Sequence, residues 1–471
     1  MVTITPHFRI SIRLFMGLLM LMGSLATIGV KIDTHAGQRE KKEPAIVLLD
    51  SPEITDLLET LGKPLVKAAG LPESSIQFHV ILDDQINAMA LPNGHLVFNS
   101  GLVQACQSSG ELASVMAHET AHLAAGHHMR IQSEMRSASI QAMLTAVASL
   151  AAGAVSKNNS IAEAGMVGGP AAAQSMLLDS MREKESQADR LGIRYLASAG
   201  YQPENMVIFL KRLLEEQRKA SIPAPYLLSH PLSVERVLDA ERTAATIPAV
   251  SGGHPNVDPM RLKRVQAVLL ASTESDPGKA EDTFNYRLKL DPKDFSSQYG
   301  LAIVHRYAGE YQKAKIILDK LAANHPKDPY LLREQGLLLL ESGQPGAAEM
   351  LFTQALALKP DNPDLRYRLS ISLSDAGRLT EADRLLRRLT VEHPDVPIYH
   401  YQLGIIEGQR QRLGHAHLSM ARYYALLLDE KMAVYHFTEA ASRFAKSDRE
   451  RDIALAELKR FKDELRKSRP Q

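Results

Sequence analysis

A histidine–glutamate–histidine pattern lies between residues 115 and 123, where the chain reads Val-Met-Ala-His-Glu-Thr-Ala-His-Leu. On a helix, His118 and His122 share one face a turn apart, so both imidazoles can reach one zinc ion at about 2.0–2.1 Å. Glu119 lies beside His118, where its carboxylate can take a proton from a metal-bound water. The apolar flanks indicate a buried helix. The pattern predicts two metal ligands and a general base for metal-dependent hydrolysis.

A catalytic zinc site needs a third protein ligand and leaves its fourth position to water. Cys106 is the chain's one cysteine, and we interpret it as a small buried apolar residue rather than a ligand. Glu185 and Asp189 lie four residues apart in a second helical segment and therefore share a face. Glu185 can ligate the metal while Asp189 holds the Nδ1–H of a ligating histidine. Taken alone, this segment also fits a solvated charged helix.

The elements around the motif mix helix and strand patterns. Leucines on one face predict a helix over Thr55–Ala69, and Ile76–Leu82 has the pattern of a strand. Two short extended runs, Asn87–Leu91 and His95–Phe98, flank Pro92-Asn93-Gly94, which is typical of a hairpin turn. The chain becomes mainly helical from Gly110 onward. We therefore expect a mostly α (α+β) fold with a small β-sheet.

Residues 131–180 have an unusual composition. Ala138–Val155 is rich in alanine, and residues 165–170 read Gly-Met-Val-Gly-Gly-Pro. One interpretation is a helical hairpin packed on the core. The other is a mobile lid or membrane-apposed plug, because glycines supply hinges. Both interpretations stay open.

A 34-residue period organises the chain from about residue 258 onward. It relates Pro292, Pro326, Pro360 and Pro394, and also Gly309, Gly343 and Gly377, and a series of alanines from Ala280 to Ala416. This period is the signature of tetratricopeptide repeats, which stack paired helices into a superhelix. Helices over Tyr423–Phe444 and Asp452–Leu465 are expected to cap the stack. Two interpretations of this array stay open: it is a binding surface for protein chains, or it only covers and stabilises the first domain.

The N-terminal residues and the composition indicate the cellular compartment of the protein. Basic residues precede the apolar run Leu14–Val30, and small residues follow it, which is typical of a cleaved signal peptide over residues 1–36. The alternative is an uncleaved anchor, although 17 residues fall short of the ~20 that a spanning helix needs. A net charge of +1 gives no electrostatic argument for nucleic acid, and a single cysteine excludes an intramolecular disulfide. We expect a bacterial periplasmic protein with peripheral membrane contact as an open option.

The paired motifs His118-Glu119-x-x-His122 and Glu185-x-x-Ala188-Asp189 resemble those of the zinc metallopeptidases that include HtpX and the CAAX prenyl proteases. Further segments are similar to that family: Asn87-Ala88, Pro92–His95, Asn99–Leu102, and Ser229–Leu232 with Arg236. A signal peptide before the domain and tetratricopeptide repeats behind it resemble the periplasmic BepA-type branch, which assists outer-membrane protein assembly and degrades stalled forms. The resemblance implies a zincin-type metallopeptidase domain over residues 37–255, with 131–180 as the lid or plug, and a repeat domain over 256–471.

The resemblance also assigns roles to individual residues. It implies one Zn²⁺ per chain held by His118, His122 and Glu185, with Glu119 as the general base and Asp189 as a supporting catalytic residue. In the BepA branch a histidine such as His230 approaches the zinc as a gate; otherwise it polarises the transition-state oxyanion or is a loop histidine. His127 and His128 are expected to point away from the ligand face, at the surface or behind the ligands.

The expected function is peptide-bond hydrolysis in quality control and assembly of outer-membrane β-barrel proteins, with chaperone-like activity. Backbone pairing with an extended run of four residues would select unfolded or stalled chains: Asn87, Ala88, Met89 and Ala90. The repeats are expected to contact the outer-membrane assembly machinery. Two other classes stay open: a non-catalytic scaffold or chaperone with a closed metal site, and a membrane-integral protease that uses Leu14–Val30 and Ala138–Val155 as spans.

Overall fold

The computed structural model describes residues 48–49, 51–127, 130, 159–219, 225–248, 259–274 and 276–468. The expected signal segment and the run Ala138–Val155 lie outside these residues. The chain divides into two compact units, one spanning Leu49–Leu269 and the other containing Leu270–Gln471. Within the described parts of the chain, no helix is both long and apolar enough to cross a bilayer.

The first unit contains the small sheet, with strands in the order β1-β2-β4-β3. The strands are β1 (Leu48–Leu49), β2 (Gln77–Ile81), β3 (Ala88–Ala90) and β4 (His95–Asn99). β2 runs parallel to β4, with Gln77 opposite His95, whereas β3 runs antiparallel to β4, with Ala88 opposite Phe98. The expected hairpin is therefore confirmed, and β3 is an edge strand of this sheet.

Glycine is required in the turn of this hairpin. Gly94 has a φ of +86°, in the region that residues with a Cβ rarely adopt. A Cβ at this position would also lie 2.1 Å from the carbonyl oxygen of Ser75. The backbone of β4 thus approaches the start of β2 closely at Gly94.

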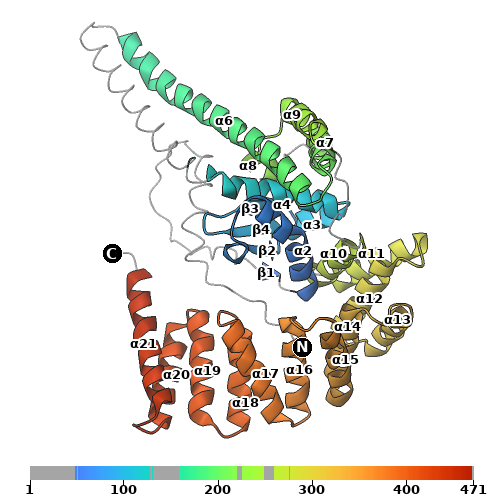
Figure 1. Cartoon of the computed structure of the whole chain (residues 1–471), viewed down its shortest axis with the longest axis vertical. Helices are drawn as coiled ribbons and strands as arrows, with labels where there is room; N and C mark the ends of the chain where they lie inside the picture. Colours follow the sequence, from blue (N-terminus) through green and yellow to red (C-terminus); the bar gives the residue numbers. More distant parts are fainter. Residues whose placement is uncertain are drawn as a thin grey trace, which may run out of the picture. The chain divides into compact units, whose positions relative to one another are not determined.

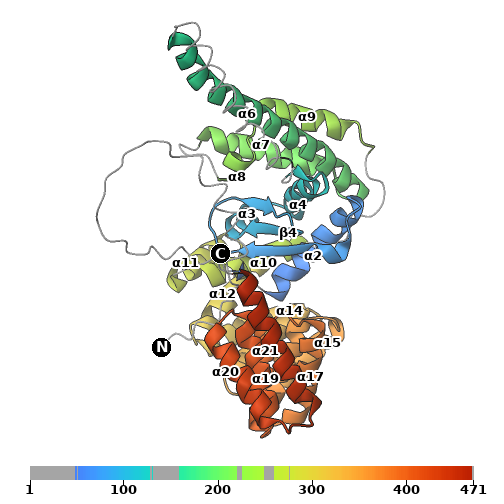
Figure 2. The same cartoon turned by 90° about the vertical axis from the view of Figure 1, so that its left-hand side faces the viewer.

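Helix α4 (Ser109–Ala124) carries the histidine motif through the interior of this unit. It lies between the sheet on one side and the helices α6 (Asn159–Ser198), α7 (Glu204–Lys219) and α9 (Val234–Ala245) on the other (Figures 1 and 2). The remaining elements of the unit are α2 (Pro52–Ala68), the short helix η1 (Glu73–Ser75), α3 (Ser100–Ala105) and α8 (Pro225–Ser229). Ser51 caps α2 by accepting a hydrogen bond from the backbone N–H of Ile54 at 3.2 Å. The helix expected over Thr55–Ala69 is confirmed.

The glycine-rich residues 165–170 lie within α6, a helix of 40 residues. Their backbone is helical, so the structure contains no turn or break at these glycines. The lid or plug remains a prediction.

Helix α10 (Pro259–Thr273) links the two units, and its first part belongs to the core of the first unit. Leu262, Val265 and Leu269 are buried there. The side-chain amide of Gln266 donates to the carbonyl oxygens of Val103 and Cys106 at 3.0 and 2.8 Å. The division between the units thus falls inside α10 rather than before it.

The second unit consists of antiparallel helix pairs, drawn from yellow to red in Figure 1. Their bounds are α11 (Pro277–Leu290), α12 (Phe295–Tyr307), α13 (Tyr311–Asn324), α14 (Pro329–Glu341), α15 (Pro345–Leu358), α16 (Pro363–Asp375), α17 (Leu379–Glu392), α18 (Pro397–Gln409), α19 (Leu413–Leu426), α20 (Glu430–Arg443) and α21 (Arg449–Ser468). The absence of a side chain at Gly336 admits the ring of Phe352, which a Cβ would meet at 2.7 Å. The expected helical repeat array is confirmed.

One expected helix is wrong. Tyr423–Phe444 is divided between α19 and α20 by the turn Leu427–Asp429. Leu428 has a φ of +56°, and the side chain of Asp429 accepts a hydrogen bond from the backbone N–H of Met432. The apolar pattern continues through the turn, so periodicity alone does not reveal this break.

Candidate metal centre

Helix α4 places three of the predicted residues in the interior. Ser108 caps the helix by accepting a hydrogen bond from the backbone N–H of Glu111 at 3.1 Å. Every residue from Gly110 to His122 is buried, because the helix packs against both the sheet and the long helix α6. His118 and His122 point the same way, and their Nε2 atoms lie 3.0 Å apart. The spacing therefore has the geometry that the sequence predicts.

Helix α6 brings the two acidic residues to α4. Oε2 of Glu185 lies 3.3 Å from Nε2 of His118, and Oε1 lies 3.2 Å from Nε2 of His122. Gly192 lies at this contact and eases it, because a Cβ there would lie 3.3 Å from the backbone nitrogen of His118, which is tighter than most Cβ contacts. A solvated helix is excluded as the environment of these two acids, since Glu185 and Asp189 are 4% and 2% exposed.

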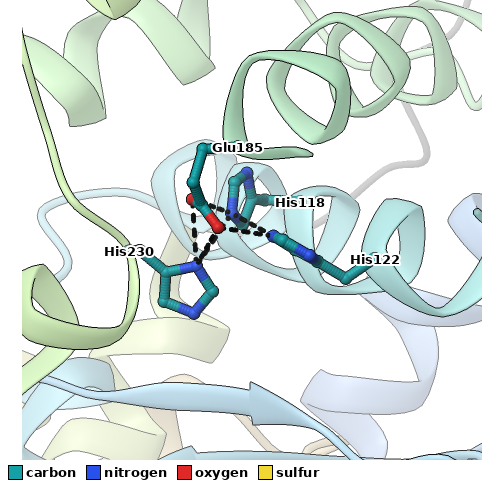
Figure 3. Close-up of side chains that lie close together, drawn as sticks. All are labelled: His118, His122, Glu185 and His230. Carbon is teal, nitrogen blue, oxygen red and sulfur yellow. Dashed lines mark hydrogen bonds and ion pairs between the residues drawn. The ribbon is translucent and has the colours of Figure 1, made fainter. Parts of the chain in front are cut away.

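His230 completes a cluster of four potential metal ligands. It follows α8 in the chain, and its Nδ1 lies 3.0 Å from Oε2 of Glu185 and 3.3 Å from Nε2 of His118. One nitrogen or oxygen atom from each of His118, His122, Glu185 and His230 lies within 4.8 Å of all the others. Figure 3 shows the carboxylate of Glu185 directed at the three imidazoles. Three elements far apart in the sequence therefore converge on one point.

A buried ion pair lies behind His118. Nδ1 of His118 is 2.9 Å from Oδ1 of Asp189. Arg236, from α9, donates to both oxygens of Asp189 at 2.8 and 3.0 Å and to the carbonyl oxygen of Pro231 at 2.7 Å. Its guanidinium also lies 3.1 Å from Oε2 of Glu185. Arg236 thus connects the acids of α6 with the backbone that follows His230.

The electrostatics suit a cation at the cluster. Burial alone would raise the pKa of Glu185, but the surrounding histidines hold it well below its usual range. Burial likewise opposes ionisation of Asp189, and Arg236 and His118 outweigh it and lower the pKa. Burial lowers the pKa of His122 to about 3, which keeps this imidazole neutral. Ionised carboxylates and a neutral imidazole are the forms in which Glu185 and His122 bind metal. The carboxylates of Asp189 and Glu185 outweigh burial and raise the pKa of His118 to about 10, so His118 must release a proton when metal binds.

Glu119 lies beside the cluster rather than in it. It is 1% exposed, and its Oε1 lies 3.6 Å from Nε2 of His230. That oxygen has no hydrogen-bond partner among the described residues. Burial raises the pKa of Glu119, while the histidines and a hydrogen bond from the backbone of Ala90 lower it in part. A carboxylate with a raised pKa and an open oxygen can exchange a proton with a neighbouring group.

The expected substrate strand lies next to Glu119, at the open edge of the sheet. Asn87 and Leu91 form hydrogen bonds with the two ends of β4. The backbone N–H of Asn99 donates to the carbonyl oxygen of Asn87 at 3.0 Å, and the N–H of Leu91 donates to the carbonyl oxygen of His95 at 2.8 Å. In an antiparallel ladder the residues between them, Ala88 and Ala90, direct their backbone groups away from β4. The side chain of Asn87 accepts from Ala88 N–H at 3.0 Å, and the side chains of Ala88 and Ala90 are buried. The backbone carbonyls of Ala88 and Ala90 and the half-buried side chains of Asn87 and Met89 are therefore presented at this edge, while Ala88 N–H is taken by Asn87 and the Ala90 backbone by Glu119.

Two residues, His127 and Gln187, lie closer to the cluster than the sequence indicates, behind His122. His127 is completely buried, with Nδ1 3.0 Å from Nδ1 of His122 and Nε2 3.1 Å from Oε1 of Gln187. A surface position for His127 is wrong, and a position behind the ligands is confirmed. The reason is that α4 ends at Ala124 and Gly126, with a φ of +65°, turns the chain back. A glycine just after the helical pattern is the signal that could have indicated this turn. His128 lies outside the described residues.

Cys106 is 3% exposed and lies in the apolar core, where burial raises the pKa of its thiol to about 12. A thiol with so high a pKa is not a ready metal ligand, because the ligand form is the thiolate. The interpretation of Cys106 as a small buried residue is confirmed.

The comparisons with known proteins agree with this arrangement. Residues 52–244 match the model of Peptidase family M48, and residues 296–328 and 339–403 match models of the tetratricopeptide repeat. The chain is 32% identical over 322 residues to the putative beta-barrel assembly-enhancing protease of Vibrio cholerae, covering 66% of this chain and 63% of that protein. It is 29% identical over 331 residues to the beta-barrel assembly-enhancing protease of Escherichia coli K12, with coverage of 66% and 63%.

A more distant relative matches a shorter part of the chain. The mitochondrial metalloendopeptidase OMA1 of Schizosaccharomyces pombe is 26% identical over 179 residues, covering 38% of this chain and 50% of that protein. The chain spans about two thirds or less of the length of the curated relatives named here. The expected peptidase domain with repeats behind it is thus confirmed: the chain contains a peptidase family M48 domain followed by tetratricopeptide repeats.

Proposed function

We propose that this protein is a zinc-dependent endopeptidase that acts on unfolded or stalled polypeptides during the assembly and quality control of outer-membrane β-barrel proteins. The observation that carries the proposal is the convergence of His118, His122, Glu185 and His230, with Glu119 beside them. The names of the relatives support the choice of client, since they are called beta-barrel assembly-enhancing proteases.

The side chains fit a zinc ion. Two imidazoles and a carboxylate are a known ligand set for catalytic zinc, which keeps one further position for water or substrate. All four candidate ligands are buried, so the cluster combines strong donors with a low-dielectric surrounding. We assign His118, His122 and Glu185 as ligands of one Zn²⁺ per chain. When bound, zinc supplies a Lewis acid that polarises the scissile carbonyl and lowers the pKa of water.

The chain's own residues then divide the remaining work. Glu119 accepts a proton at Oε1 and returns it to the leaving amine. Asp189 fixes His118 through Nδ1 and is itself held by Arg236. The outward carbonyl groups of Ala88 and Ala90 accept hydrogen bonds from an extended substrate, as an added strand on β3 between Asn87 and Ala90. Backbone pairing selects conformation over sequence, and an unfolded segment satisfies it.

His230 has two proposed roles that differ in outcome. As a gate, its Nδ1 occupies the ligand position that water needs, which its 3.0 Å approach to Glu185 supports. As an electrophile, its Nε2, which faces Glu119 at 3.6 Å, stabilises the developing oxyanion. The gate requires movement of the segment around residue 230, and Arg236 holds that segment through the carbonyl of Pro231.

The repeats supply the proposed partner surface. Tetratricopeptide arrays form concave faces for polypeptides, and we assign this array to the client chain or to the outer-membrane assembly machinery. We place the protein in the periplasm on the basis of the apolar N-terminal run and the relatives' names. Holding a client without cleaving it would also give chaperone-like activity.

The test is Glu119→Gln, measured for zinc content and for hydrolysis of an unfolded protein substrate. Zinc should stay at one per chain while the rate falls by roughly 10²–10⁴-fold, because only the proton acceptor is lost. Glu185→Gln should instead lose zinc during dialysis against a chelator. Glu183→Gln is the matched control, since Glu183 is exposed on the same helix. Undiminished hydrolysis by Glu119→Gln, or zinc binding without hydrolysis in the wild type, would contradict the proposed enzyme.

A further inference from the structure

The buried His127 and the half-buried Gln187 form a chain of contacts behind His122. Nδ1 of His127 faces Nδ1 of His122 at 3.0 Å, and Nε2 of His127 faces Oε1 of Gln187 at 3.1 Å. His127 is 0% exposed although it comes directly after the turn at Ala125 and Gly126 that follows α4. Gln187 comes from α6, two residues after Glu185. The contact therefore joins the helix that carries the histidines to the helix that carries the acid.

The two nitrogens of His122 face different groups. Nε2 faces the cluster, 3.0 Å from Nε2 of His118 and 3.2 Å from Glu185. A neutral imidazole binds metal through the nitrogen that carries no proton. If Nε2 binds the metal, the proton of His122 resides on Nδ1, and Nδ1–H can donate to Nδ1 of His127 at 3.0 Å.

The tautomer of His127 follows from the same rule. Its Nδ1 accepts from His122, so a neutral His127 carries its proton on Nε2 and donates it to Gln187. The amide oxygen of Gln187 can only accept, which matches this direction. Each contact in the chain thus has one donor and one acceptor when Nε2 of His122 is free to bind metal. With a neutral His127 and Oε1 of Gln187 as acceptor, the other tautomer of His122 would place two acceptors in contact, either at His122–His127 or at His127–Gln187.

We propose that His127 and Gln187 are positioning residues that fix the tautomer and the ring orientation of His122. This inference rests on the proposed metal site. The two ligating histidines would then be held by different chemistry, His118 by the carboxylate of Asp189 and His122 by a neutral imidazole and an amide. A neutral support behind His122 adds no further buried negative charge near Glu185 and Asp189.

Replacement of His127 separates hydrogen bonding from packing. His127→Leu fills much of the same volume and has no acceptor, whereas His127→Asn places Oδ1 close to the position of Nδ1. Loss of a group that supports a ligating histidine typically weakens metal binding by about 10–100-fold. His127→Leu should therefore show a zinc Kd raised by about 10–100-fold in competition with a chelator, and His127→Asn should stay within about threefold of the wild type.

Replacement of Gln187 provides a second pair of variants. Gln187→Met keeps the length of the side chain without the acceptor, and Gln187→Glu keeps an acceptor. Gln187→Met should weaken zinc binding by up to about tenfold, while Gln187→Glu should not. Each full-length variant would be loaded with Co²⁺, whose visible spectrum reports ligand geometry, and its fold would be checked by circular dichroism. The spectrum should change in His127→Leu and Gln187→Met and remain like the wild type in the other two.

The outcomes distinguish this inference from the proposed function. Wild-type zinc affinity in folded His127→Leu and Gln187→Met would overturn the positioning role and leave the metal site intact. Equal weakening by His127→Asn and His127→Leu would also overturn it, because the acceptor would then not matter. If His127→Leu does not fold, the Gln187 pair decides. A wild-type chain that binds no zinc would instead refute the proposed function.

Discussion

Arg236 offers a sharp test of how this site is held together, because two ion pairs join the same helices in different surroundings. Arg236 of α9 pairs with Asp189 of α6, and the two side chains are 5% and 2% exposed. Arg190, the next residue of α6, pairs with Asp239 of α9, and these side chains are 42% and 36% exposed. The two pairs therefore share helices and chemistry and differ in burial.

The expected magnitude follows from that difference. Arg236→Met replaces the buried guanidinium side chain with an uncharged side chain of similar volume. The carboxylates of Asp189 and Glu185 then lose their nearest fixed positive charge. Breaking a buried pair from one side costs about 3–5 kcal/mol, since the remaining charge stays desolvated. Arg190→Met breaks a pair that water already screens, for which about 0–1 kcal/mol is expected.

Hydrogen exchange with mass spectrometry can attribute the effect to the first unit, because it reports opening free energies peptide by peptide. The zinc-free chain is appropriate, since a bound cation would compensate Glu185. In Arg236→Met the slowest amides of α9 should exchange faster by about two to nearly four powers of ten. In Arg190→Met the acceleration should stay below about fivefold.

A double variant checks the physical cause. Asp189→Asn with Arg236→Met should recover part of the protection, because one carboxylate is no longer buried without a partner. Equal effects of Arg236→Met and Arg190→Met would refute the reasoning, and so would a double variant that is less protected than Arg236→Met. Either result would mean that burial does not set the value of the Asp189 ion pair.

Three further predictions concern other parts of the chain. His230→Ala should raise the rate of peptide hydrolysis if Nδ1 of His230 blocks the water position, and lower the rate if Nε2 binds the oxyanion. An unchanged rate would assign His230 a structural role. Arg333 and Arg368 outweigh the effect of burial and lower the pKa of Asp364 from 3.8 to about 2. The ion pairs of Asp364 should therefore contribute about 2 kcal/mol to the free energy of unfolding above pH ~4, and this contribution should be lost as the pH falls towards ~2. The difference in unfolding free energy between wild type and Asp364→Asn should accordingly shrink on acidification, and a constant difference would contradict the assignment. A chain ending after Thr273 should fold and cleave a short peptide but lose apparent affinity for its protein client. A chain ending near residue 255 should be unstable because it lacks the buried Leu262, Val265 and Leu269. Circular dichroism tests the stability and KM on both substrates tests the affinity, and a stable shorter chain would refute the prediction.

Local rules account for the parts of this protein that the sequence by itself determines. His118 and His122 share a face because the helical period requires it, and no tertiary contact is needed for that conclusion. The repeats follow from a 34-residue period, in which Gly336 and Phe352 must be small and large at facing positions. The hairpin of β3 and β4 follows from the turn at Gly94, whose backbone conformation favours glycine. In each case the determining interaction lies within one element or between neighbours in the chain.

Tertiary structure decides the remainder, because the partners are far apart in the sequence. The pattern of Glu185 and Asp189 also fits a solvated helix, and only the packing of α6 against α4 buries these two acids. Arg236 lies 47 residues from the acid that it binds. His127 would point away from His122 on a continuous helix, and only the left-handed turn at Gly126 brings it beneath that ligand. A helical period predicts directions only as far as the helix continues, so this contact became visible only in the folded chain.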